Sequence, residues 1–369
     1  MSSTTYRIAL AGLGNVGASL LDILHREAES LRSRYGVQFL VTGVAEWGGG
    51  AIDTNGLDLA LLLKNLRQKD PVSHLPVVGK PGMEAIEMVE LAKADFFLEA
   101  TPVNLEHGQP GLGHVFSALE HGMHVVLANK GPAALAYRDL ANMSDLGYGW
   151  GGEYNPDFVP TTGCNPVPKL RFSACAAGAL PSVNLGRYDL AGCRIQRVEA
   201  IFNGTTQYIL RAMEAGQSYE EALIDAQQRG IAETNPALDV DGWDAAAKLV
   251  IVANSALGQP TQLSDVTVQG IRELTLADIR QALDNNTRVV LLCLAEYVNG
   301  AYQLSVKPTP LPISHPLCQI TPDEMAVTYY SKDVDRLFVA SSEPGPEPAA
   351  AAMLRDMLEI IRSKLENKA

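Results

Sequence analysis

Acidic and basic side chains crowd into one stretch of the sequence, GIAETNPALDVDGWDAAAKLV at residues 230–250. Lys248 follows Asp244 by four residues, so the two side chains share a face if the segment after Gly242 is helical. The apolar, alanine-rich sequence that follows predicts such a helix, and a lysine at its buried face can lose solvent and transfer protons. The nearby carboxylates could hold a small cationic substrate; a solvated ion pair at a helix start is the alternative. These carboxylates belong to Glu233, Asp239, Asp241 and Asp244.

A second group of residues suited to chemistry lies near the N-terminus. An apolar run at residues 7–11 leads into the pattern G-x-G-x-x-G, and a helical pattern follows. In this strand–turn–helix context the pattern predicts a dinucleotide site, with phosphates bound at the helix N-terminus. The candidate cofactor-binding residues of this turn are Gly12, Leu13, Gly14, Asn15, Val16 and Gly17.

Glu46 ends a second predicted strand, residues 39–46, where an acid suits the ribose 2′-OH of a dinucleotide. It lies further along the sequence than is usual, and a long first helix explains the extra distance. No arginine follows to pair with a 2′-phosphate, so we expect NAD or NADP as cofactor, with NAD favoured. The alternative for Glu46 is a surface acid at the end of a strand.

Strand and helix patterns alternate through residues 1–150, which predicts an α/β fold with a Rossmann-type, doubly wound parallel sheet. Ligands of such sheets bind beyond the carboxyl ends of the strands. Lys130 follows one predicted strand end and is therefore expected at the cofactor edge. The other candidates at these ends are Thr101, Pro102 and Asn129.

A Gly- and Pro-rich loop at residues 147–168 marks a predicted domain boundary. We expect a dinucleotide-binding domain at residues 1–150 and an α+β substrate-binding and dimerisation domain at 151–317. A C-terminal segment, 318–369, is expected to return to the first domain.

Two local patterns in the second domain predict structure. The tetrapeptide Asn203-Gly204-Thr205-Thr206 opens a helix, with Thr205 or Thr206 as its expected cap. Segments on either side of Asn299-Gly300 predict two antiparallel strands.

Composition excludes several classes of protein. The formal net charge of −13 argues against nucleic acid or an anionic membrane as partner, because both need a basic face. The five cysteines are scattered and show no metal-ligand spacing, which indicates a reducing cytoplasm. No signal peptide and no membrane-spanning run is predicted. Three histidines lack partners at ligand spacing, so no metal site is predicted there: His114, His121 and His124.

The motifs GLGNVG, TPVN, HVVLANKGPAALA, GALP, FNGTTQYIL and AETNPALDVDGWDAAAKLVIVA occur in this order. Together they resemble homoserine dehydrogenase, in a short form without a regulatory or kinase domain, from about Arg7 to the C-terminal helix. The resemblance implies reversible hydride transfer between L-homoserine and L-aspartate 4-semialdehyde, a step in threonine and methionine biosynthesis. It also implies a homodimer.

Carried over position by position, the resemblance makes Lys130 and Lys248 the catalytic lysines. We expect their ammonium groups to converge on one substrate oxygen beside the nicotinamide. The residues implied in substrate binding are Glu233, Asp239, Asp244, Asn203, Gly204 and Thr205.

Three segments depart from the family pattern: FSACAAGALP, ASSEPGPEPAAAA and the 147–168 loop. Ser173 stands where the family has a glutamate, so a monovalent cation near Ser173, Ala176 and Gly178 is expected to bind weakly, and no other metal is expected. Two alternatives stay open: a dehydrogenase for another small hydroxy amino acid, and an NAD(P)-binding protein without turnover. An aldehyde dehydrogenase would need an activated thiol, whereas Cys175 is expected to be small and buried.

Overall fold

The computed structural model describes residues 3–149 and 157–366. The chain forms two compact units: unit 1 comprises Met1–Gly178 and Gly345–Ala369, and unit 2 comprises Ala179–Pro344. These limits differ from the expected ones at residues 150 and 317. The predicted loop at 147–168 lies partly outside the described residues.

A seven-stranded sheet forms the centre of unit 1, in the order β4-β3-β2-β1-β5-β6-β7. Strands β2, β1, β5, β6 and β7 are parallel, which confirms the predicted parallel sheet. Strands β3 and β4 add an antiparallel edge that the sequence did not predict, because these short Gly- and Pro-containing segments show no alternation. The strands are β1 (Thr4–Ala11), β2 (Val37–Glu46), β3 (Gly49–Ile52), β4 (Gly79–Pro81), β5 (Phe96–Glu99), β6 (His124–Leu127) and β7 (Leu170–Arg171).

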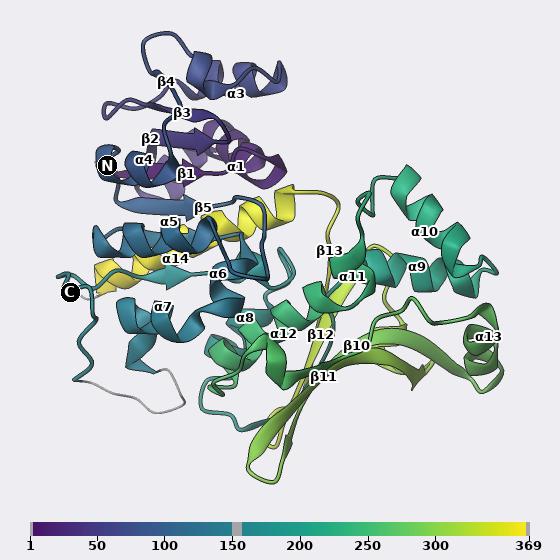
Figure 1. Cartoon of the computed structure of the whole chain (residues 1–369). Helices are drawn as coiled ribbons and strands as arrows, with labels where there is room; N and C mark the ends of the chain where they lie inside the picture. The colour runs from purple at the N-terminus through teal and green to yellow at the C-terminus, as the bar shows by residue number, and fades with distance from the viewer. Residues whose placement is uncertain (1–2, 150–156, 367–369) are drawn as a thin grey trace. The chain divides into compact units, whose positions relative to one another are not determined.

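The C-terminal helix α14 (Glu347–Glu366) belongs to unit 1, and it follows unit 2 in the sequence. Figure 1 shows it in yellow beside the sheet of unit 1. Its residues Met353, Met357 and Ile360 are fully buried in the same apolar cluster as Ile8 and Leu20. The other helices of unit 1 are α1 (Asn15–Arg26), α2 (Ala28–Tyr35), α3 (Leu59–Arg67), α4 (Ala85–Leu91), α5 (Gly111–Glu120), α6 (Lys130–Leu135) and α7 (Tyr137–Met143).

A six-stranded, mainly antiparallel sheet supports unit 2, in the order β13-β12-β8-β10-β11-β9. The predicted pair of strands around Asn299-Gly300 is confirmed, since β10 and β11 pair from Thr287 with Pro312 to Val298 with Ala301. The strands are β8 (Ile195–Ile201), β9 (Val266–Val268), β10 (Thr287–Val298), β11 (Ala301–Pro312), β12 (Glu324–Ser331) and β13 (Asp335–Ser342).

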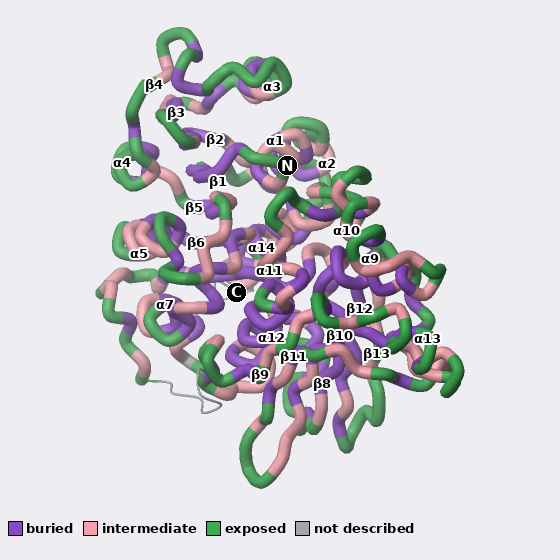
Figure 2. Tube along the Cα trace, turned by 45° about the vertical axis from the view of Figure 1, so that its right-hand side comes forward, coloured by how far each residue is buried: buried purple, intermediate pink, exposed green. Residues whose placement is uncertain are grey.

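The helices of unit 2 include α12, the apolar helix predicted after Gly242, whose residues Ala245 to Ala253 are buried except for Lys248. Figure 2 shows this buried helix in purple. The helices are α8 (Ser182–Asn184), α9 (Gly204–Glu214), α10 (Tyr219–Gln228), α11 (Ala237–Val240), α12 (Trp243–Ala256) and α13 (Leu276–Asp284).

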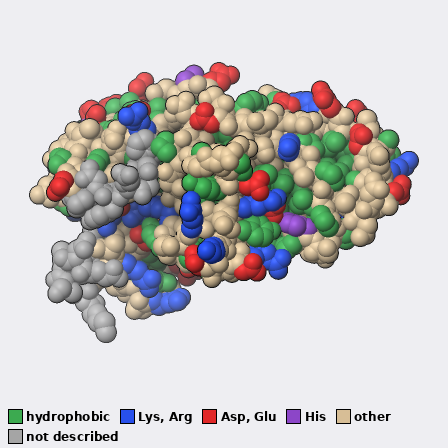
Figure 3. Space-filling view, turned by 90° about the horizontal axis from the view of Figure 1, so that it is seen from below, with side chains coloured by type: hydrophobic (Ala, Val, Ile, Leu, Met, Phe, Trp, Pro, Cys, Tyr) green, Lys and Arg blue, Asp and Glu red, His purple; other side chains and the backbone are tan. Residues whose placement is uncertain are grey.

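Surface charge and hydropathy agree with the composition. On the face drawn in Figure 3, acidic and basic side chains are interspersed among apolar ones. Within residues 3–149 and 157–366, none of the helices has the length and apolar character that crossing a bilayer requires.

Candidate functional site

The glycine turn after β1 has the geometry of a dinucleotide cradle. Gly12 has φ +93°, and a Cβ there would lie 2.3 Å from the carbonyl carbon of Ala100, so only glycine fits. A Cβ on Gly17 would lie 2.0 Å from the Gly12 carbonyl oxygen. A Cβ on Gly14, in contrast, would meet no atom within 4 Å. The first and third glycines are required by the fold, whereas Gly14 leaves open space at the start of α1, as phosphate binding requires.

Glu46 lies at the carboxyl end of β2, beside this turn, because the Gly12 amide donates to the Ala45 carbonyl at 2.9 Å. Its Oε1 accepts a hydrogen bond from the Val72 amide at 2.7 Å. The carboxylate is therefore held in place by the short helical turn η1 (Val72–His74). This geometry suits a hydrogen bond to a ribose hydroxyl.

A buried carboxylate joins the ends of β5 and β6. Glu99 is 0% exposed, and its Oε1 accepts from the Thr101 amide at 2.9 Å and from the Thr101 hydroxyl. Its Oε2 is 2.9 Å from Nδ1 of His114 on α5. The Asn129 amide group donates to Thr101 Oγ1 at 3.2 Å. Glu99 is not among the residues predicted from the sequence, although an acid at the end of an otherwise apolar strand is a signal for it.

Lys130 is the first residue of α6, and it is positioned by this network. Asn129 is the N-cap, because its Oδ1 accepts from the Gly131 amide at 3.0 Å. A positive charge in the first turn of a helix is unfavourable, because the helix dipole is positive at that end. Lys130 therefore does not stabilise α6. Lys130 is half-buried at the carboxyl edge of the sheet, where it was predicted.

The second cluster lies entirely in unit 2 and joins β8, α11 and α12. The Lys248 ammonium lies 2.8 Å from Asp244 Oδ2 and donates to the Phe202 carbonyl at 2.6 Å. The Asn203 side-chain amide donates to Asp244 Oδ2 at 2.8 Å and to Asp239 Oδ1 at 2.6 Å. The structure therefore brings Phe202 and Asn203 together with a second group, 36 to 46 residues further along the chain. This second group is Asp239, Asp244 and Lys248.

Burial gives this cluster its chemical character. The side chains of Lys248 and Asp244 are 12% and 9% exposed, so the i,i+4 pair is not a solvated surface pair. Charges held at this depth interact more strongly than they would in water. The solvated alternative is therefore wrong for Asp244 and Lys248. The carboxylate of Asp241, in contrast, pairs with Arg272 at an exposed position.

Asn203 also begins α9, which corrects the predicted cap. Its Oδ1 accepts from the Thr206 amide at 2.8 Å, so Asn203 is the N-cap and the prediction of Thr205 or Thr206 was wrong. The Thr205 hydroxyl instead donates to the Ile231 carbonyl at 3.2 Å. An extended asparagine directly before the helix satisfies the capping geometry, whereas the threonines already lie in the first turn. Gly204 presents open space, since a Cβ there would meet no atom within 4 Å.

The structure also describes the surroundings of two other predicted site regions, at Glu233 and at Ser173 to Gly178. The Glu233 side chain is exposed, and its described hydrogen bond is made by its carbonyl, which accepts from Gln227 at 3.1 Å. The Ser173 hydroxyl donates to Asp356 of α14 at 2.6 Å. Ala176 is buried and Gly178 is half-buried nearby. No group of three or more His, Cys, Asp or Glu side chains in the described part of the chain is arranged to hold a metal ion.

Cys175 is fully buried, and burial raises the pKa of its thiol well above the ordinary range. Its Sγ donates to the Leu127 carbonyl at 3.3 Å. A thiol in this state is a poor nucleophile, which disfavours thioester chemistry.

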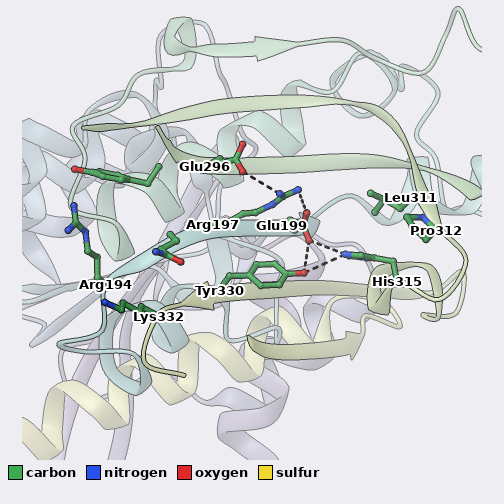
Figure 4. Close-up of a pocket in the computed structure, with 11 residues that line it drawn as sticks. Arg194, Arg197, Glu199, Glu296, Leu311, Pro312, His315, Tyr330 and Lys332 are labelled. Atoms are coloured by element: carbon green, nitrogen blue, oxygen red, sulfur yellow. Dashed lines mark hydrogen bonds and ion pairs between the residues drawn. The ribbon is translucent and has the colours of Figure 1, made fainter. Parts of the chain in front are cut away.

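A cavity of about 910 Å³ lies on the sheet of unit 2 and includes none of the predicted site residues. In Figure 4 its most buried acid, Glu199, points toward Arg197, Tyr330 and His315. The Glu199 Oε2 accepts from the Tyr330 hydroxyl at 2.8 Å and lies 3.0 Å from His315 Nε2. Burial raises the pKa of the Tyr330 hydroxyl to about 12, and the hydrogen bond to Glu199 and the charge of that carboxylate add to the rise. The Glu199 Oε1 accepts from the Arg197 guanidinium, so both carboxylate oxygens have partners within the protein.

A glycine turn that fits a dinucleotide, on a Rossmann-type sheet, and a second unit that holds a buried lysine among acids are features of NAD(P)-dependent oxidoreductases. The relatives described next show an oxidoreductase that acts on CH–OH groups. Comparison with known proteins specifies the family. A family model described as homoserine dehydrogenase matches residues 181–358.

Two curated relatives match nearly the whole chain. Homoserine dehydrogenase of Methanocaldococcus jannaschii is 33% identical over 96% of this chain and 98% of its own length. The NAD(+)-dependent homoserine dehydrogenase of Pseudomonas canavaninivorans is 31% identical over 98% of this chain and 97% of its own. A solved homoserine dehydrogenase from Thiobacillus denitrificans is 27% identical with a TM-score of 0.80, covering 99% of this chain and 75% of that one. The chain belongs to the homoserine dehydrogenase family.

Proposed function

We propose that this protein interconverts L-homoserine and L-aspartate 4-semialdehyde by reversible hydride transfer with NAD or NADP. The observation that supports this most directly is the buried Lys248–Asp244 pair, held by Asn203 beside Asp239. A lysine ammonium can protonate or stabilise the alkoxide oxygen, and carboxylates can bind the α-ammonium of the substrate. The nicotinamide, when bound, accepts or supplies the hydride.

In this proposal Asp244 and the Phe202 carbonyl orient the Lys248 ammonium toward the reacting oxygen. Asp239 binds the substrate ammonium, and Gly204 and Thr205 lie at the start of α9 beside it. Glu233 would contribute from an exposed position. A role for Lys130 in the proton transfer stays a prediction from the sequence. It is supported by the position of Lys130 at the start of α6.

The cofactor proposal favours NAD. The Glu46 carboxylate at the end of β2 would repel a 2′-phosphate bound there, and the residues after it, Trp47 to Ile52, carry no basic side chain. One relative is named NAD(+)-dependent, and a hyperthermophilic archaeal structure of similar fold (TM-score 0.78, 23% identity) is in complex with NADPH. The ratio of kcat/KM for NAD to that for NADP tests this preference, and a ratio below one would contradict it.

The direct experiment is homoserine-dependent reduction of NAD at alkaline pH. We expect Lys248→Met and Lys130→Met each to lower kcat by at least about 100-fold, the usual scale for a general acid–base group. Lys64→Met, on α3 of unit 1, is the control, because Lys64 is exposed and lies outside both clusters described above. Binding of NAD without homoserine-dependent turnover would contradict the proposal. A panel of hydroxy amino acids separates homoserine from other small alcohols.

We further propose a cytoplasmic homodimer that uses the sheet of unit 2, including β10 and β11. Its support is the family resemblance, together with free cysteines at all five positions. Light scattering should then give twice the 39.6 kDa mass of one chain. A mass equal to one chain at micromolar concentration would contradict the dimer.

A further inference from the structure

Trp47 is the most exposed large apolar side chain among the described residues, and the function proposed above does not use it. Its exposed fraction is 101%, so the indole contacts almost none of the protein. Single exposed apolar side chains are common, but tryptophan is highly buried on average because its apolar surface is large. An indole without protein contacts therefore points to a ligand or partner that covers it.

The turn that carries Trp47 is fixed by the fold. Glu46 of β2 pairs with Gly49 of β3, so Trp47 and Gly48 form a two-residue turn between these strands. Gly48 has a φ of +91°, and its carbonyl accepts from the Gly82 amide at 2.9 Å. Small or polar residues are usual in tight turns, so the turn itself gives no reason for an indole. The backbone of Trp47 is held, whereas its side chain has no task in the fold.

The space beside this turn is open. A Cβ on Gly48 would meet no atom within 4 Å, and the same is true of a Cβ on Gly82. These neighbours have no side chains that could cover the indole. A planar group therefore has room to lie against it.

The position of Trp47 relative to the proposed cofactor residues indicates which group this is. Glu46, directly before it, is held at the end of β2 by the Val72 amide, and the adjoining Ala45 carbonyl accepts from the Gly12 amide. In the proposed function Glu46 binds a ribose hydroxyl, and the phosphates lie at the glycine turn. The ribose carbon that carries the 2′-OH is bonded to the carbon that carries the adenine. The base must then lie within side-chain reach of the residue next to Glu46.

Adenine has the chemistry that an exposed indole can bind. It is a flat aromatic base, and stacking on an aromatic side chain removes one face of each ring from water. A second copy of the chain could also cover Trp47, but its binding would not depend on adenine. The adjoining Glu46 favours the base, because it ties the site to the adenosine half of the cofactor.

We propose that Trp47 is a cofactor-binding residue whose indole stacks on the adenine of NAD or NADP. This inference rests on the proposed function, because the position of the base follows from a ribose bound at Glu46. It applies to both cofactors, since both carry the same base.

Calorimetric titration of the full chain with ADP tests the proposal without turnover, because ADP carries the adenine and its ribose. Trp47→Ala should weaken ADP binding by about 5- to 150-fold, the range that loss of an aromatic side chain gives for base stacking. Trp47→Phe keeps a smaller aromatic face and should lose less than Trp47→Ala. The thermal midpoint of Trp47→Ala should equal that of wild type, because the indole has almost no protein contacts.

Val77→Ala is the matched control. Val77 is 99% exposed in the same unit. It precedes Gly79, which pairs with Ala51 at the end of β3 away from Trp47. Its removal should leave the affinity for ADP unchanged.

Two further measurements separate stacking from a structural role. ADP should quench the tryptophan fluorescence of wild type and quench Trp47→Phe much less, although Trp150 and Trp243 remain in that variant. In homoserine-dependent turnover, Trp47→Ala should raise the KM for NAD and leave kcat unchanged, which is the pattern of lost uniform binding.

Wild-type affinity for ADP in Trp47→Ala would overturn the inference. The same affinity together with a lower assembly mass by light scattering would assign Trp47 to a contact between copies, which also overturns it. If wild type bound neither ADP nor NAD, the proposed function and this inference would both fail. If ADP bound as expected and homoserine gave no turnover, the proposed reaction alone would fail.

Discussion

At the scale of single residues, Asn203 has two tasks that one side chain performs at once. Its Oδ1 caps α9, and its Nδ2 donates to the carboxylates of Asp239 and Asp244. A neutral amide between two acids reduces their repulsion, because its two N–H groups satisfy one oxygen of each.

We therefore expect Asn203→Ala to lower kcat/KM for homoserine by about 100-fold and to lower the free energy of unfolding by about 1–2 kcal/mol through loss of the cap. Steady-state kinetics and urea unfolding measure the two effects. Ser218→Ala is the matched control, because Ser218 caps α10 in the same unit. It should cost similar stability and leave kcat/KM unchanged; equal kinetic losses in both variants would contradict the role of Asn203.

The glycines of the β1–α1 turn give a second prediction at this scale. Gly12→Ala should destabilise unit 1 by more than about 2 kcal/mol, because both its φ of +93° and the contact with Ala100 exclude a side chain. Gly14→Ala should leave stability unchanged within about 0.5 kcal/mol and weaken NAD binding at least about tenfold, since the added methyl occupies the space that a pyrophosphate needs.

Thermal unfolding and titration of NAD fluorescence quenching measure the glycine variants. Equal destabilisation by both substitutions would show that the two glycines have the same role. Undiminished NAD binding by Gly14→Ala would contradict the placement of the phosphates at α1.

At the scale of elements, the attachment of α14 to the sheet of unit 1 depends on a buried acid. Asp356 of α14 accepts from the Ser173 amide at 2.8 Å and from its hydroxyl at 2.6 Å. Burial raises the pKa of Asp356 to about 6, although the bonds from Ser173 oppose that rise. The folded state therefore binds a proton more tightly than the unfolded chain does.

The sign of the pH dependence follows from this raised pKa. The stabilising contribution of protonated Asp356 is fully present below the pKa of the unfolded chain and is lost as the pH rises through about 6. We expect the free energy of unfolding of wild type, relative to Asp356→Asn, to fall as the pH rises from about 4 to about 6, and to level off above that. Urea unfolding at several pH values tests this, and a difference independent of pH would contradict it. Ser363→Ala, on the same helix, is the control.

At the scale of the whole molecule, the predicted cofactor-binding turn and the lysine–acid cluster belong to different units of the chain. The glycine turn and Glu46 belong to unit 1, and Lys248 with its acids belongs to unit 2. A ligand stabilises the state that binds it, by about 2.7 kcal/mol at a concentration 100 times its Kd.

We expect saturating NAD, added without homoserine, to slow hydrogen exchange mainly in unit 1, and most strongly around Gly12 to Gly17 and Glu46. Mass-spectrometric exchange of the full chain measures this. Protection of equal size around Asn203 and Lys248 would contradict the separation of cofactor and substrate residues. Exchange with ADP in place of NAD is the control for the phosphate contacts.

Much of this structure could be predicted from local sequence. The parallel sheet, the β10–β11 pair, the apolar helix α12 and the dinucleotide turn follow from hydrophobic periodicity and from glycine positions, which act over a few residues. The i,i+4 relation of Asp244 and Lys248 follows from helix geometry alone. The family follows from motifs spread over the length of the chain.

The tertiary structure decided the rest, because partners and burial depend on residues far apart in the sequence. Only the fold shows that Asn203 bridges Asp239 and Asp244, or that Glu99 meets His114. Glu343 reaches Ala179 in the same way. Desolvation of a side chain is set by the elements that surround it rather than by its neighbours in the chain. The sequence therefore predicts that Lys248 and Asp244 share a helix face, but only the packed structure shows that this ion pair is buried.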